Sequence, residues 1–182
     1  YTLLAVAHLI LGGLGVRTLA RTLKLSPPAA TAAGALFMAA GPVLSLFSLW
    51  HHYASACWMP WVLAAAETTF RARRVRPALW WAGAQTMQVL AGSADMCAAT
   101  SLLAAGRLLC HIRWNAPALE LNLRLCGLTA LALVLGLGAS AAQWMPTVGI
   151  EGGRINLVPV DFVVDAMDHI AHRKGLDGGC FH

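Results

Sequence analysis

Long apolar stretches separated by short connectors are the feature that most restricts how this chain can fold. Six stretches run through residues 1–150: Thr2–Val16, Ala29–Leu49, Ala54–Phe70, Ala78–Ala91, Met96–Ile112 and Asn122–Trp144. A helix needs about 20 apolar residues to cross the hydrocarbon core of a bilayer, with a range of about 17–25. The second and sixth stretches are long enough and the third is adequate. The fourth is short, so it is either tilted or forms a re-entrant pair with the fifth.

The composition supports a membrane environment. Of the 182 residues, 58% are hydrophobic and 12% are charged, and the mean hydropathy is +0.64. Soluble domains have about 45–50% apolar and about 25% charged residues, so the additional apolar surface has to face lipid. We therefore predict an all-α fold for residues 1–150, a polytopic transmembrane helical bundle of about six spans.

The positive charges of residues 1–150 fall only at alternate connectors. Arg17, Arg21 and Lys24 follow the first stretch, and Arg71, Arg73, Arg74 and Arg76 follow the third. Arg107, Arg113 and Arg124 bracket the connector after the fifth. The connectors Trp50–Tyr53 and Gly92–Asp95 contain no Lys or Arg. Lys and Arg concentrate in cytoplasmic loops, which predicts a multi-pass membrane protein with its N-terminus outside. Charges confined to loops do not form the basic stripe of a nucleic-acid-binding protein, so we expect no nucleic-acid partner.

Residues 151–182 differ in character and form a second predicted unit. They carry a net charge of −2, whereas residues 1–150 carry +7. The run RINLV at Arg154–Val158 has strand composition, and Asp161–His172 has apolar residues at helical spacing. We predict a short soluble strand–helix tail.

Four runs in the first unit carry a family resemblance: AHLILGGLGVRTLARTLKLSPPAATAAGALFMAAGPVLSL, MPWVLAAAE, QVLAGSAD and ASAAQWMP. Residues from about 7 to 150 resemble the bacterial YfhO-like membrane proteins, which are similar to the GT-C class of glycosyltransferases. The resemblance implies transfer of a polyprenyl-phosphate-linked sugar at the outer face of the bacterial inner membrane. It places the family's catalytic acid before Tyr1, so the catalytic residues stay unassigned. Where the family more often has a His-Pro-Gln-like turn, this chain has Ser93, Ala94 and Asp95.

The tail carries a second resemblance, through GGRINLVPVDFVVDAMDHIAH followed by GLDGGCFH. It looks like a piece of an extended short-chain dehydrogenase of the fatty-acyl or thioester reductase type. The family's GxxGxxG and YxxxK motifs are absent from the chain, so the segment has neither a phosphate cradle nor a proton donor. Because the predicted orientation puts the tail outside, away from cytosolic NADP, we expect it to be a fusion, frameshift or degraded-gene remnant.

Polar residues at the predicted outer face are the candidate substrate-binding residues: Asp95, His51, His52 and Gln143. Asp95 can act as a base or metal ligand for a lipid-phosphate donor, or simply cap the fifth span. The histidines can contact a diphosphate, or lie at the interface without a ligand. Adjacent helical residues point about 100° apart, which makes them a poor metal-binding pair. Gln143 can bind a sugar hydroxyl or a neighbouring helix.

The remaining polar and small residues of the apolar stretches are interpreted as structural. We expect His8 to be a buried, hydrogen-bonded imidazole, and Gln85 and Gln88 to bind a neighbouring helix. Prolines inside the spans predict kinks, and glycines predict close helix contacts; these residues are Pro42, Pro60, Gly12, Gly13, Gly15, Gly136 and Gly138. The five cysteines have no CxxC spacing, so no disulfide framework or zinc site is assigned, and no cofactor is assigned either.

Three functions fit these patterns. The first is a fragment of a GT-C-like glycosyltransferase that acts on a polyprenyl-phosphate sugar and contacts membrane lipid. The second is a non-enzymatic membrane transporter or complex subunit of the same topology. The third, based on the tail, is the remnant of an NADP-dependent acyl or thioester reductase.

Overall fold

The computed structural model describes residues 2–112 and 119–148, and these residues fold as helices joined by short turns. The elements are α1 (Thr2–Thr22), α2 (Pro27–Ala39), α3 (Gly41–Ser45), the 3-10 helix η1 (Leu46–Ser48), α4 (Trp50–Ala72), α5 (Val75–Leu90), α6 (Ala94–His111), α7 (Leu119–Ala139) and α8 (Ala141–Val148). The chain divides into two compact units, Tyr1–Trp144 and Met145–His182. The predicted strand–helix tail lies outside the described residues.

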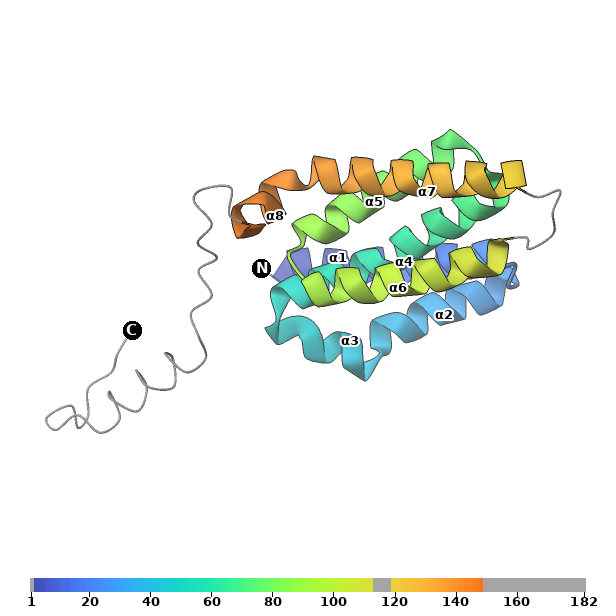
Figure 1. The fold of residues 1–182 in the computed structure, drawn as a ribbon. Coiled ribbons are helices and arrows are strands. Elements are labelled where there is room, and N and C mark those ends of the chain that lie inside the picture. Colours follow the sequence, from blue (N-terminus) through green and yellow to red (C-terminus); the bar gives the residue numbers. More distant parts are fainter. Residues whose placement is uncertain (1, 113–118, 149–182) are drawn as a thin grey trace, which may run out of the picture. The chain divides into compact units, whose positions relative to one another are not determined.

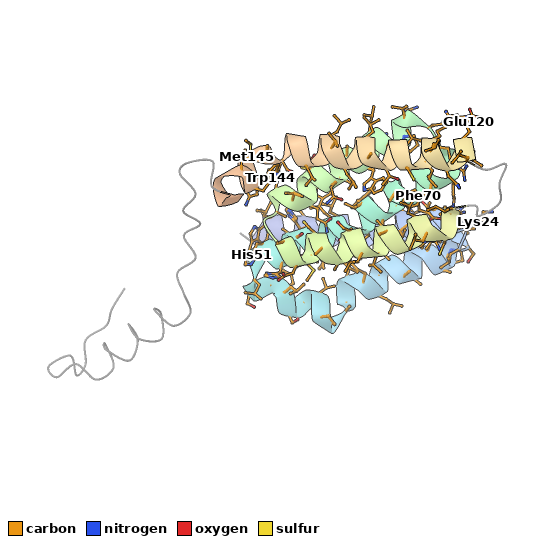
Figure 2. All side chains as sticks on the ribbon, viewed as in Figure 1. Lys24, His51, Phe70, Glu120, Trp144 and Met145 are labelled. Carbon is orange, nitrogen blue, oxygen red and sulfur yellow. The ribbon has the colours of Figure 1, made fainter. Side chains whose placement is uncertain are left out.

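In the first unit, each predicted apolar stretch is helical, although the second is divided among α2, α3 and η1 and the sixth between α7 and α8. Successive segments run in opposite directions (Figure 1). The α1–α2 and α4–α5 turns therefore lie at one end, which we call the arginine end after Arg21, Arg73 and Arg74. The start of α4 and the α5–α6 turn lie at the other, which we call the histidine end after His51 and His52 (Figures 1 and 2).

Helix breaks follow local sequence chemistry. Ser26 occupies the N-cap position of α2 with Pro27 behind it, as predicted, although the Ser26 hydroxyl makes no capping hydrogen bond. The predicted kink at Pro42 is a full break, because Ala40 is extended (φ −69°, ψ 128°) between α2 and α3. Pro60 is buried inside α4, which continues through it.

Glycines allow α1 to approach its neighbours closely. A methyl group on Gly12 would lie 2.6 Å from the Phe37 ring, and one on Gly34 would lie 2.6 Å from the Gly13 carbonyl oxygen. Gly12, Gly13 and Gly15 are all buried, which confirms their predicted packing role. In α7, Gly136 likewise packs against Gln85, whereas Gly138 has open space around it.

Helix α4 lies at the centre of the first unit and packs against α1, α5 and α6. The aromatic side chains of Phe70 and Trp81 are buried and meet edge to face at 5.4 Å between ring centroids. Tyr53 is also buried, and its hydroxyl donates a hydrogen bond of 2.7 Å to the Ala5 carbonyl oxygen. These contacts tie α1 and α5 to α4.

Much of the apolar surface points away from this core. Among the described residues, three helical segments are long and apolar enough to cross a membrane: Thr2–Thr22, Pro27–Ser48 and Leu119–Ala139. No more than 28% of the most apolar stretch of each is buried within the protein, and side chains such as Leu36 and Val134 are about 70% exposed. Exposed apolar area on this scale is typical of a membrane-facing or partner-facing surface.

Candidate functional site

At the histidine end, the structure brings residues from three separate segments together. His51 and His52 come from the first turn of α4, Asp95 from the first turn of α6, and Gln143 from α8. Gly92 lies between them: a methyl group on it would be 3.5 Å from Gln143 Nε2 and 3.8 Å from His51 Cβ. We call these five residues the histidine-end cluster. Figure 2 shows the labelled His51 at this end.

An ion pair links two members of the cluster. His52 Nε2 lies 3.5 Å from Asp95 Oδ2. The Asp95 side chain is 85% exposed, whereas that of His52 is 24% exposed, so the carboxylate faces outward and remains accessible. The second ring nitrogen of His52, Nδ1, is buried with no hydrogen-bond partner in the described protein. The His51 and His52 rings are 4.2 Å apart between centroids.

Local geometry fixes the α5–α6 turn that presents Asp95. Gly92 has φ +91°, a left-handed conformation that glycine adopts without steric cost. The next residue, Ser93, is buried and its hydroxyl accepts a hydrogen bond of 3.4 Å from the Met96 N–H. Ser93 is therefore the N-cap of α6. Asp95 therefore lies in the first turn of α6 and not at the predicted cap position, while its side chain is exposed to solvent.

Beneath the cluster, buried polar side chains join α4, α5 and α6. Gln88 Nε2 donates to Thr100 Oγ1 at 2.7 Å, and the Ser55 hydroxyl donates to the Gln88 carbonyl oxygen at 3.3 Å. These bonds confirm that Gln88 binds neighbouring helices. Through Gln88 they also link α4 to α6, and this link helps to keep His52 of α4 near Asp95 of α6. The side-chain oxygen of Gln88 has no hydrogen-bond partner in the described protein.

The cluster offers hydrogen-bond donors and acceptors of several kinds in one place. Imidazole and amide N–H groups suit phosphate oxygens, and a carboxylate and an amide oxygen suit sugar hydroxyls. In residues 2–112 and 119–148, no group of three or more His, Cys, Asp or Glu side chains is arranged to hold a metal ion. The cluster therefore offers groups that could hydrogen-bond a polar headgroup.

A second polar cluster lies towards the arginine end, and the sequence did not predict it. Glu67 is an acidic residue within an apolar helix, and its side chain is only 2% exposed. Arg107 of α6 donates to both carboxylate oxygens, with Nε–Oε2 at 3.1 Å and Nη2–Oε1 at 2.9 Å. Arg71 Nε lies 2.6 Å from Oε1, and His111 Nε2 lies 3.3 Å from each oxygen. We call these four residues the Glu67 cluster.

The Glu67 cluster has a clear physical role. Two guanidinium groups neutralise a carboxylate that would otherwise be costly to bury, and they connect α4 to α6. The sequence interpretation grouped Arg107 with the cytoplasmic connector after the fifth stretch. In the structure, Arg107 lies within α6, and its guanidinium pairs with Glu67, which is 40 residues earlier in the chain. A lone acidic residue in an apolar span is itself a signal for an internal partner, and that signal could have identified Glu67.

His8 differs in part from its prediction. Its Nδ1 lies 2.9 Å from the Leu4 carbonyl oxygen, so the imidazole is hydrogen-bonded, but the residue is only half-buried. Its ring meets Trp50 edge to face at 5.2 Å. His8 thus lies beside the start of α4 and forms part of the packing around the histidine end.

Comparison of the chain with protein-family models, with curated proteins and with solved structures found no match. Evidence for function therefore comes from the two clusters, the distribution of charge and the apolar surface.

Proposed function

We propose that the first unit is a multi-pass protein of a bacterial inner membrane, with six helical segments crossing the bilayer. Three segments have the length and apolarity to cross. The other three, α4, α5 and α6, pack against one another, and the buried acid that they bring, Glu67, is neutralised by arginines. Cations gathered at the arginine end support a cytoplasmic location for that end, with the histidine end outside.

For this membrane protein we propose binding of a polyprenyl-phosphate-linked sugar at the outer face, as part of a GT-C-like glycosyltransferase. The observation that carries the proposal is the convergence of Asp95, His51, His52 and Gln143 at one end of the bundle. The histidines would contact the phosphate, and Asp95 and Gln143 would contact the sugar hydroxyls. No catalytic residue is assigned, so enzymatic activity depends on an acid or base from elsewhere.

The test is an Asp95→Asn substitution in the full chain, with glycolipid and wall-polymer modification assayed in cells. The substitution keeps the size of the side chain but removes its charge and the His52 ion pair, so we expect at least about a tenfold loss of product, the loss typical of removing a charged hydrogen-bonding group from a site. Glu120→Gln is the matched control, because Glu120 is an exposed acid at the opposite end. Unchanged products in Asp95→Asn would contradict the proposal.

A second candidate function is a non-enzymatic transporter or complex subunit. The observation that favours it is the 85% exposure of the Asp95 carboxylate, because such a group is not shielded from water as most catalytic carboxylates are. Unchanged glycolipid products in the Asp95→Asn strain would support this function.

The reductase alternative depends on residues 151–182, which lie outside the described residues. It requires that the full chain bind NADP. If a fluorescence titration of the purified protein with NADPH showed no saturable binding, this alternative would be excluded.

A further inference from the structure

A groove of about 690 Å³ lies between α1, α4 and α5, on the side of the bundle rather than at either end. Helices α1 and α5 both pack against α4, and the groove runs along α4 between them. Its walls are mostly apolar and include three tryptophans, Trp58, Trp61 and Trp80. It contains neither the histidine-end cluster nor the Glu67 cluster.

The polar residues of the groove are all at its arginine end. Thr18, Thr68 and Arg76 lie within about one turn of the α1 and α4 C-termini and the α5 N-terminus, respectively. Both threonine hydroxyls donate to carbonyl oxygens of their own helices, at 2.8 Å and 2.7 Å. Arg76 is exposed and makes no hydrogen bond or ion pair within the part of the chain that the structure describes. Its guanidinium is therefore the free donor at the groove mouth.

The length of the groove corresponds to one leaflet of a bilayer. Along α5 it extends from Arg76 to Met87, which is about 16 Å at 1.5 Å per residue. That is about half of the roughly 30 Å hydrocarbon thickness. An amphiphile with its headgroup at Arg76 would therefore end its chain near the bilayer midplane.

We propose that this groove is a binding site for an anionic phospholipid of the cytoplasmic leaflet. The phosphate would pair with Arg76, which guanidinium geometry favours, and one acyl chain would lie along the tryptophan-lined wall. Charge complementarity selects this occupant, because a neutral helix from a second copy would leave Arg76 unpaired. The inference needs the bilayer embedding proposed above, but not the sugar or the outer-face site.

Gly83 provides a way to block the groove. It lines the wall, and a methyl group placed on it meets no other atom within 4 Å. A Gly83→Leu side chain would therefore fill the groove, and leucine is a better helix former than glycine. Gly127→Leu is the matched control, because Gly127 on α7 is equally open and does not line the groove.

Three of the chain's seven tryptophans line the groove, so a quenching preference that Gly83→Leu abolishes reports occupancy of the groove. The full chain is reconstituted in phosphatidylcholine bilayers that contain phosphatidylglycerol, with either lipid brominated on its acyl chain to quench tryptophan emission. At equal mole fraction, we expect stronger quenching by the brominated phosphatidylglycerol. Gly83→Leu should abolish this preference and Gly127→Leu should retain it. Arg76→Gln should lower the preference about fivefold, the effect of losing one partly exposed ion pair worth about 1 kcal/mol. Arg74→Gln should not lower it, because Arg74 does not line the groove.

Three results would overturn the proposal. The first is equal quenching by both brominated lipids in the natural chain. The second is a phosphatidylglycerol preference that survives both Gly83→Leu and Arg76→Gln. The third is a dimer in the bilayer whose formation shields the tryptophans from both lipids, because that would assign the groove to a second copy. If Asp95→Asn left glycolipid products unchanged, the sugar proposal would fail, but the quenching experiment would still test the groove.

Discussion

Glu67 shows how one residue can determine the way two helices meet. Its carboxylate is buried, and three side chains converge on it, two of them, Arg107 and His111, from α6. Such a pair adds little net stability when intact, because desolvation offsets the attraction. Removing one partner is different, since it breaks the charge-assisted hydrogen bonds that the buried Glu67 carboxylate accepts. The cluster therefore specifies the α4–α6 contact more than it strengthens it.

We expect Glu67→Gln to lower the free energy of unfolding by about 1.5–3 kcal/mol, the range for hydrogen bonds to charged groups. The amide keeps the shape but leaves the guanidiniums of Arg71 and Arg107 without a counter-charge. Thermal unfolding of the detergent-solubilised protein measures the effect. Glu120→Gln makes the same charge change at an exposed position and should leave the unfolding temperature within about 2 °C, as a surface substitution does. Equal effects of the two variants would show that the Glu67 ion pairs carry no stability.

At the residue scale, the location of Asp95, His51 and His52 at one end of the bundle was predictable, and the partners of Glu67 were not. The orientation rule placed Asp95, His51 and His52 at one face from charge alone. It could not reveal that His52 pairs with Asp95, because that contact needs α4 and α6 to be adjacent. The partners of Glu67 were hidden for the same reason: Arg107 is 40 residues away, and sequence spacing offers no link between them.

Helices α1 and α2 approach each other closely. The Gly34 Cα faces the Gly13 carbonyl oxygen, and Arg17 Nε donates to Thr31 Oγ1 at 3.3 Å on the same interface. Contacts of this kind between small residues let helix backbones pack where lipid offers no hydrophobic driving force.

We expect Gly34→Ala to destabilise the fold by about 1–3 kcal/mol, because the added methyl group meets a backbone oxygen that cannot rotate away. Gly83→Ala is the control for helix propensity: its methyl group meets open space, so it should stabilise by about 0.5–1 kcal/mol. Opposite shifts of the unfolding temperature in the two variants are the expected result. A stabilised Gly34→Ala protein would show that α1 and α2 are not in tight contact.

At the element scale, the helices were largely predictable and their breaks only partly so. Pro42 marked the break between α2 and α3, because proline removes a backbone donor. The break between α7 and α8 at Ser140 has no proline. There the Ser140 hydroxyl donates to the Gly136 carbonyl oxygen at 2.9 Å, and Trp144 Nε1 donates to that of Leu137 at 2.9 Å. Side-chain bonds of this kind compete with the helical ladder, but the sequence does not show which serine will do so.

At the scale of the whole molecule, the alternation of charge along the chain becomes a separation of charge in space. Because successive segments are antiparallel, connectors that alternate in sequence fall at the same end (Figure 1). Lys24 at one end and His51 at the other illustrate this separation (Figure 2). The sequence pattern predicted this polarity because it depends only on segment order. It could not predict the groove between α1 and α5, which depends on how both helices pack on α4.

Cysteine accessibility in intact cells tests the orientation that this polarity implies. In a background without the native cysteines, Ala94→Cys at the histidine end and Arg74→Cys at the arginine end are both exposed positions in turns or first turns of helices. We expect a membrane-impermeant maleimide to label Ala94→Cys in intact cells and Arg74→Cys only after permeabilisation, because Lys and Arg are retained on the cytoplasmic side. Labelling of both positions in intact cells would contradict the six-span arrangement. The reverse pattern would preserve the spans but place the histidine-end cluster in the cytoplasm, away from any outer-face lipid-linked sugar.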